Sequence, residues 1–302
     1  MSKTFIDKAY AVVPEFENRI SRFDKKLRIA QYAEHSIYDY KLKIAQAVIY
    51  IQKLPDDFTQ DDIEGYLSSL VDQQRYSISF FKHTVFGLQN YYKVMGLKQP
   101  RGLALPKVKK PKKLPRVLSQ SSITRLLKCC GLYDKTLLAL TYDCALRVSE
   151  VCRLRWEDIC FDRQMLFVCQ GKGMKDRYVP ISSQMLLVLS AFRKKYPSDD
   201  FVFKTHGKGV TPQRITPPYV RTILKNALTK ASLDPAITIH ALRHSAATHL
   251  LENGENILNV QKRLGHARVT TTLVYLHVAD IEPKNSVLLI NTLFPPKDED
   301  KI

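Results

Sequence analysis

The sequence lacks the features that define several large classes of protein. It contains no run of about 18 apolar residues, which excludes a transmembrane helix. The opening residues MSKTFIDKAYAVV have neither the apolar core nor the cleavage site of a secretory signal. The six cysteines include no CxxC pair, which argues against a zinc ribbon or a disulfide framework. We therefore expect a cytoplasmic protein with reduced thiols and no membrane partner.

Two common catalytic motifs are also missing. No GxxxxGK[ST] pattern is present, so a P-loop ATPase is not expected. His240 and His244 have the i, i+4 spacing of a zinc-binding HExxH motif, but Ala241 occupies the position of its glutamate. We expect neither a metal site nor a cofactor.

Acidic residues are scarce relative to basic ones. The 302 residues carry 47 Lys+Arg against 29 Asp+Glu, which gives a net charge of +18. Such a surplus favours a polyanionic partner, because each neutralised phosphate releases condensed counterions. An anionic membrane would require a concentrated basic amphipathic helix, and the sequence shows none. A polyanionic partner is therefore expected, and the length is sufficient for two domains.

The positive charge is concentrated between two patterned regions. Residues 98–116 hold eight basic and no acidic residues, together with four prolines that prevent a continuous helix. We predict a linker over 101–117 that follows phosphates through Lys109, Lys110, Lys112 and Lys113. The alternative is a linker that is merely solvated, which is common for runs of like charge.

The region before the linker, residues 14–100, has the pattern of a small helical bundle. Apolar residues recur at helical spacing from Ile37 to Ile51. Thr59 and Asp62 have the spacing of a capping box, and a stripe that ends at Gly96 predicts a third helix.

The region after the linker, residues 118–285, is predicted to be mostly helical with a small antiparallel β-sheet. Ser119 is a predicted helix cap. The segments MLFVCQ and RYVPIS, separated by GKGMKD, predict a hairpin. The predicted helices lie near 120–130, 133–145, 148–154, 183–195, 218–231, 240–252, 256–264 and 269–278. The tail 286–302 begins with apolar residues that need a surface to cover, in this chain or in a neighbour.

Six side chains in the second region form a set suited to phosphodiester chemistry without a metal. Taken singly, each has an ordinary structural explanation. An arginine matches two phosphate oxygens, and two arginines can neutralise a pentacoordinate phosphorus. A tyrosine hydroxyl can attack phosphorus, and a lysine or histidine can protonate the expelled sugar oxygen. The six are Arg147, Lys172, His240, Arg243, His266 and Tyr275.

The motifs that contain these residues resemble those of the tyrosine recombinase (phage integrase) family, and of Xer-type recombinases in particular. They are ALRVSE, GKGMKDR, HALRHSAATHLLENG, LGH and TTLVYLH, in the family's order over roughly residues 118–280. The resemblance implies a mainly α fold. An N-terminal SAM-like core-binding bundle would precede a mostly α catalytic domain with a small antiparallel sheet.

The resemblance also implies a role for each residue. Arg147 and Arg243 would bind the scissile phosphate, and Lys172 would protonate the leaving 5′ oxygen. His240 would act in proton transfer, His266 would hydrogen-bond the phosphate, and Tyr275 would be the nucleophile. Two further residues, Lys175 and Arg177, are predicted DNA contacts. We expect His244, His249 and His277 to be structural or to support the catalytic residues rather than to act directly in catalysis. We expect Ala145, where the family often has Gly, to have no functional cost.

The implied activity is site-specific recombination or integration of DNA. Tyr275 would form a 3′-phosphotyrosyl link, and a 5′ hydroxyl of a second duplex would reverse it, without metal or ATP. The implied partner is double-stranded DNA, with four protomers acting on two duplexes. The role could be chromosome resolution, phage integration or transposition of a mobile element. Two alternatives stay open: a type IB-like topoisomerase, and a DNA-binding regulator that keeps the fold without the chemistry.

Overall fold

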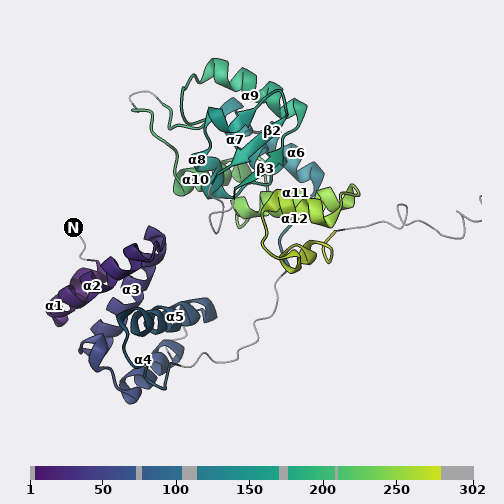
Figure 1. Cartoon of the computed structure of the whole chain (residues 1–302). Coiled ribbons are helices and arrows are strands. Elements are labelled where there is room, and N and C mark those ends of the chain that lie inside the picture. Colours follow the sequence, from purple (N-terminus) through teal and green to yellow (C-terminus); the bar gives the residue numbers. More distant parts are fainter. Residues whose placement is uncertain (1–3, 73–76, 104–113, 170–175, 208–209, 280–302) are drawn as a thin grey trace, which may run out of the picture. The chain divides into compact units, whose positions relative to one another are not determined.

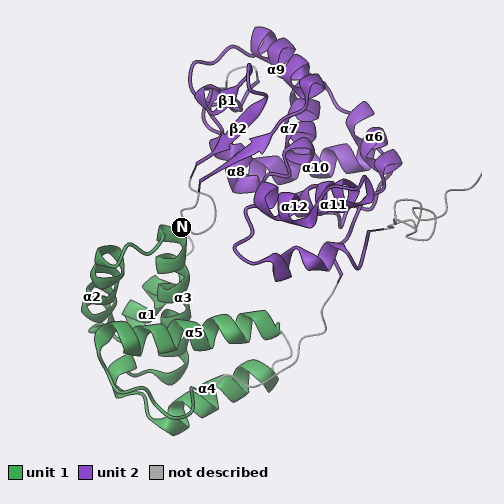
Figure 2. Ribbon diagram, turned by 45° about the vertical axis from the view of Figure 1, so that its right-hand side comes forward, with its two compact units in different colours: residues 1–111 green, residues 112–302 purple. Residues whose placement is uncertain are grey.

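The computed structural model describes residues 4–72, 77–103, 114–169, 176–207 and 210–279. The chain divides into two compact units, residues 1–111 and 112–302, and each is described by itself (Figure 2). Within the described ranges, no helix is both long and apolar enough to cross a membrane. Several predicted features lie outside the described residues: the four linker lysines, Lys172, Lys175 and the tail. Of the predicted linker 101–117, only residues 101–103 and 114–117 are described.

The first unit is entirely helical, as predicted (Figure 1). Its elements are α1 (Phe5–Val12), α2 (Phe16–Ile29), α3 (Glu34–Ile51), the 3₁₀ turn η1 (Pro55–Asp57), α4 (Gln60–Asp72) and α5 (Ile78–Met95). The three helices expected from apolar spacing are α3, α4 and α5. The predicted capping box precedes α4, where the Thr59 amide donates to the Asp62 carboxylate at 2.9 Å. Gly96 ends α5 with a φ of 75°, which glycine adopts at little cost.

Two helices of the first unit had not been predicted. The first, α1, begins with a capping box between Thr4 and Asp7. Helix α2 buries Phe16, Ile20, Phe23 and Leu27 at helical spacing. Both helices pack against α3, and their apolar residues join one core with those of α3, α4 and α5. All residues of this core lie between Ala9 and Leu103.

The second unit is mostly helical and contains one small sheet, as predicted (Figure 1). Its helices are α6 (Gln120–Lys128), α7 (Leu132–Asp143), α8 (Val148–Arg153), α9 (Ser183–Lys195), α10 (Pro217–Lys230), α11 (Ile239–Glu252) and α12 (Ile257–Leu264), with the 3₁₀ turns η2 (Trp156–Asp158), η3 (Val269–Thr271) and η4 (Leu273–Tyr275). Ser119 caps α6 by accepting a hydrogen bond from the Ser122 amide at 3.2 Å. Each of the predicted helices except the last is present.

The sheet contains the predicted antiparallel hairpin. Strand β2 (Met165–Val168) pairs with β3 (Arg177–Pro180), with Leu166 opposite Val179 and Val168 opposite Arg177. A short strand that had not been predicted, β1 (Ile159–Cys160), pairs with the other edge of β2. The register places Arg177 at the start of β3. The two predicted lysines belong to residues 170–175, which the structure does not describe.

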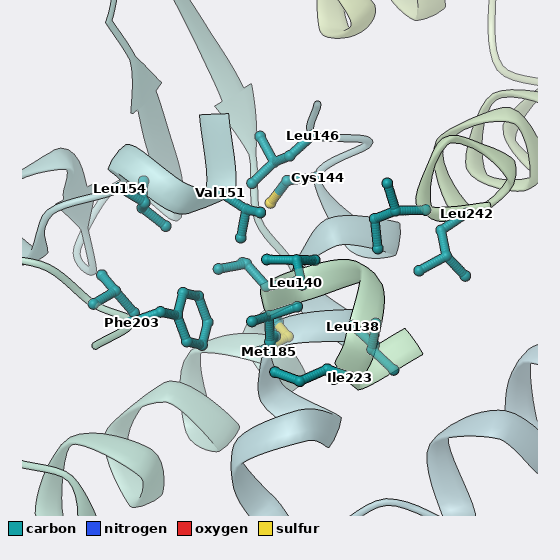
Figure 3. Packing of buried hydrophobic residues seen from close by; sticks show 14 of the residues in the cluster. Leu138, Leu140, Cys144, Leu146, Val151, Leu154, Met185, Phe203, Ile223 and Leu242 are labelled. Atoms are coloured by element: carbon teal, nitrogen blue, oxygen red, sulfur yellow. The ribbon is translucent and has the colours of Figure 1, made fainter. Parts of the chain in front are cut away.

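Helix α7 lies in the middle of the second unit's main core. Figure 3 shows Leu138, Leu140 and Cys144 from the α7 segment among residues of α8, α9 and α10. Because α7 is held on several sides, its C-terminal end is fixed in position. The residues that follow, Ala145 to Arg147, therefore start from a rigid support.

A second, smaller core holds the end of the described chain. It consists of Ala145, Ala246, Ala247, Leu251, Val260, Leu264 and Tyr275. The helix predicted over 269–278 is wrong: the structure has the 3₁₀ turns η3 and η4, separated by the buried Thr272. Four consecutive β-branched residues, 269–272, disfavour an α-helix because their χ1 freedom is restricted. The two turns bring the Tyr275 side chain back onto α11.

Candidate active site

A buried carboxylate organises the region around the end of α7. The side chain of Glu150, on α8, is only 2% exposed. It accepts two hydrogen bonds of 2.9 Å from Arg177 and one of 2.7 Å from Arg147. It also accepts from the Arg147 amide at 2.8 Å, which caps the start of α8. Burial alone would raise the pKa of Glu150, but these partners outweigh it and lower the pKa to about 2.

Arg243, on α11, is a nearly completely buried cation. Its side chain is 1% exposed and lies 3.9 Å from Glu150. It donates to the carbonyl of Ala145 at 2.7 Å and to the carbonyl of Leu264. Burial, followed by the charge of Arg147, lowers its pKa to about 10, so it remains cationic at neutral pH. Ala145 follows the end of α7 and Leu264 is the last residue of α12, so one side chain ties α11 to the ends of both helices.

Arg177 does not have the surroundings expected of a DNA contact. Its side chain is 9% exposed, and besides its two bonds to Glu150 it donates to the carbonyl of Arg263 at 2.9 Å. A Cβ atom added at Gly265 would meet the Arg177 side chain at 3.0 Å. These contacts show that Arg177 supports Glu150, and its predicted contact with DNA stays a prediction.

Tyr275 lies beside these charges and is 2% exposed. Its hydroxyl is 2.8 Å from Nδ1 of His244, on α11. Burial raises the pKa of Tyr275, while the positive charges of Arg243 and Arg147 act in the opposite direction. Sequence spacing does not distinguish His244 from its neighbours, because this contact depends on the turn at η4 that folds Tyr275 back onto α11.

Two further histidines of the predicted set lie in the same place. The ring of His266 is nearly parallel to that of Tyr275, with centroids 6.4 Å apart, and its Nδ1 is 3.0 Å from Oγ1 of Thr272. Burial, then Arg243, lowers the pKa of His266 to about 4. The ring of His240 contacts that of His244, with centroids 4.9 Å apart. Burial, then the charge of Arg243, also lowers the pKa of His240.

The structure therefore gathers five of the six predicted catalytic residues, and Lys172 lies outside the described part of the chain. The other two histidines are elsewhere: His249 hydrogen-bonds Tyr142 at 2.7 Å, and His277 is exposed. Among the described residues, no group of three His, Cys, Asp or Glu could hold a metal ion. A pair of fixed cations can bind a phosphodiester, and a tyrosine hydroxyl beside them can attack its phosphorus.

We predict that Glu150→Gln lowers the free energy of unfolding of the second unit by about 3 kcal/mol, because it leaves buried arginines without their counterion. Because the folded pKa of Glu150 is below its unfolded value, this contribution is present above pH 4.5 and is lost as the pH falls towards about 2. Fluorescence of Trp156, the only tryptophan, reports urea unfolding of this unit because the side chain is buried there.

The matched control is Glu157→Gln, which removes a carboxylate that is 71% exposed and paired with Arg155. It should change the unfolding free energy by less than about 0.5 kcal/mol. If the Glu150 and Glu157 variants are equally stable at pH 7, the carboxylate does not hold the arginines in place.

Comparisons with known proteins show to which family the chain is similar. Residues 111–282 match the phage integrase family, and residues 20–99 match the N-terminal SAM-like domain of phage integrases. A tyrosine recombinase of Thermosipho africanus is 30% identical over 278 residues, which cover 87% of this chain and 96% of the relative. Tyrosine recombinase XerA of Pyrococcus furiosus is 35% identical over 243 residues, or 76% and 84% of the two chains.

The fold has a counterpart among solved structures. A lambda integrase fragment, residues 75–356, crystallised as a dimer bound to a COC′ core site, superimposes with a TM-score of 0.68 at 17% identity. The match covers 90% of this chain and 96% of that one. The extent of these matches shows that the protein belongs to the phage integrase family of tyrosine recombinases, and that it is a site-specific DNA recombinase.

Proposed function

We propose that the protein cuts one DNA strand at its site by attack of the Tyr275 hydroxyl on the scissile phosphorus. A Tyr275 oxygen–phosphorus bond forms, the bond from phosphorus to the 5′ oxygen breaks, and the 3′ end stays attached to the protein. The observation that carries this proposal is the burial of Tyr275, which is 2% exposed, close enough to Arg147 and Arg243 for their charges to act on its pKa. Burial strengthens the attraction of these cations for a developing negative charge.

Arg147 and Arg243 are the residues that we propose to hold the phosphate. A guanidinium has five N–H donors, and the bonds of Arg243 to two carbonyls leave others for phosphate oxygens. The side chain of Arg147 is 18% exposed, so it can meet a ligand from solvent while Glu150 fixes its orientation. His266, held through Thr272, would donate a further hydrogen bond to the same phosphate.

The leaving 5′ oxygen requires a proton, and Lys172 is our candidate for its donor. A free 5′ hydroxyl, from the same or a second duplex, would then attack the phosphotyrosine and return the proton to Lys172. The phosphotyrosine conserves the energy of the broken phosphodiester, so resealing requires no nucleotide.

Exchange between two duplexes sets the size of the assembly that we propose. Two duplexes have four strands to break, and each protomer supplies one Tyr275 for one covalent link. Four protomers are therefore required for complete exchange, and a contact made by the tail 286–302 with a neighbour would close such a ring. The four linker lysines are proposed to follow DNA phosphates. The lambda integrase counterpart was crystallised on a DNA core site, which supports DNA as the partner.

We predict that the protein forms a covalent adduct with a nicked suicide duplex of its site, and that excess chelator does not prevent it. The arginines, rather than a divalent ion, neutralise the phosphate. Tyr275→Phe should abolish the adduct on a denaturing gel, whereas Tyr142→Phe, which loses a similar histidine contact outside the site, should keep it. An adduct that disappears in chelator while DNA binding persists would contradict the proposal.

A second assay distinguishes recombination from relaxation of supercoiled DNA by a topoisomerase: only recombination joins strands from two labelled duplexes.

We predict that the Lys172→Ala variant does not cleave normal DNA but does cleave DNA in which sulfur replaces the 5′ bridging oxygen. A thiolate, with a reference pKa of about 8.5, leaves without an acid, whereas an alkoxide does not. Lys175→Ala should be mild on both substrates. Rescue of Lys175→Ala instead of Lys172→Ala would reverse the assignment, and rescue of neither would place the acid elsewhere.

We predict that Gln at positions 109, 110, 112 and 113 reduces the slope of log affinity against log salt by about 0.9 for each lost phosphate contact. The control is Arg at the same four positions, which keeps the charge and should keep the slope. If the Gln variant retains the original slope, the linker is solvated and does not follow the DNA.

A further inference from the structure

The hydrogen bond between Tyr275 and His244 has no part in the function described so far. Nδ1 of His244 lies 2.8 Å from the Tyr275 hydroxyl, and the two ring centroids are 5.6 Å apart. The tyrosine is 2% exposed and His244 is only partly exposed. Because Tyr275 is buried, a side chain in contact with its hydroxyl is the nearest acceptor for the proton that leaves during attack.

We propose that His244 is the general base that takes the phenolic proton of Tyr275. This rests on the proposed role of Tyr275 as nucleophile. As the tyrosine oxygen bonds to phosphorus, its proton moves to Nδ1 of His244 and gives an imidazolium, while the 5′ oxygen leaves with a proton from Lys172. On resealing, the imidazolium returns the proton to the departing tyrosine oxygen, so both directions balance.

Three histidines lie near the nucleophile, and their contacts distinguish them. His266 has its Nδ1 engaged with Thr272 and its ring parallel to that of Tyr275. His240 has its ring against His244, one turn earlier on α11. His244 has a nitrogen at hydrogen-bond distance from the reacting oxygen. This contact assigns the proton of Tyr275 to His244 and leaves proton transfer at other atoms to His240.

The surroundings keep His244 in the form that a base requires. Burial, then the charges of His240 and Arg243, lowers its pKa to about 4, so it is neutral at pH 7. Because burial also raises the pKa of Tyr275, the proton stays on the tyrosine in the free protein. A phosphate bound at the arginines would add negative charge and raise the pKa of His244, which makes the transfer favourable only when DNA is present.

Two substitutions at His244 separate a base from a simple hydrogen-bond acceptor. His244→Asn can place an amide oxygen near the position of Nδ1, but this oxygen does not take up a proton at neutral pH. His244→Phe keeps a ring and removes the acceptor. Single-turnover cleavage of the nicked suicide duplex at pH 7 should slow by about 10²- to 10⁴-fold in both variants. A His244→Asn variant that cleaves at the rate of the unchanged protein would overturn the proposal.

The pH dependence provides a readout that a structural role would not change. Without a base, cleavage follows the fraction of phenolate, which rises tenfold for each pH unit below the pKa of the tyrosine. The ratio of the unchanged protein's rate to that of His244→Asn should therefore fall about tenfold per pH unit between pH 6 and 8. The other groups around the pair, His240, His266, Arg147 and Arg243, are present in both proteins, so their titration cancels. A ratio independent of pH would show that His244 only positions Tyr275.

Two controls test the location and the step. His249→Asn alters the other histidine–tyrosine pair of α11, in which His249 is 5% exposed and bonded to Tyr142, and should leave cleavage unchanged. In a Tyr275→Phe background, ligation of a DNA end with a 3′ p-nitrophenyl phosphate bypasses the tyrosine, so adding His244→Asn should have no effect. Slower ligation would show that His244 acts on the phosphate or the fold. An adduct formed by Tyr275→Phe alone would refute the nucleophile instead.

Discussion

The attraction between one buried carboxylate and the arginines around it determines the shape of the active site. Three guanidinium groups, from Arg147, Arg177 and Arg243, would repel each other in a region that excludes water. Glu150 offsets this repulsion, and its second role as the cap of α8 fixes where that helix begins. One side chain therefore links the turn after α7, strand β3 and helix α11, which lie far apart in the sequence.

The other supports of the arginines are backbone carbonyls, and their direction depends on two left-handed residues. Ala145 has a φ of 50° after the end of α7, and Gly265 has a φ of 63° at the end of α12. These turns accompany the bonds from Arg243 to the carbonyls of Ala145 and Leu264. The left-handed conformation explains why glycine suits position 145. Alanine there carries a strain of roughly 1 kcal/mol, while its methyl group joins the core around Tyr275.

The sequence predicted the helices whose signals are local and predicted less where the outcome depends on tertiary contacts. The caps at Thr59 and Ser119 and the hairpin around residues 170–175 follow from short patterns. The two residues of β1 carry too little pattern to be recognised. The contacts of Arg177 with Glu150 and Arg263 could not be predicted from the sequence, because these partners come from other elements. The motifs do not distinguish the contacts of His244 from those of its neighbours, because only the 3₁₀ turns after α12 bring Tyr275 to it.

Burial of the nucleophile together with its cations has a consequence for control of the reaction. In the free protein Tyr275 is neutral and hydrogen-bonded, Glu150 neutralises part of the arginine charge, and His244 is a weak base. In this state the tyrosine keeps its proton, because burial raises its pKa and His244 is too weak a base to remove the proton. A DNA phosphate adds the missing negative charge between the arginines and the histidine, and thereby raises the basicity of His244 while the arginines stabilise the transition state. The substrate is thus part of the electrostatics that activate the tyrosine, which restricts its reactivity to bound DNA.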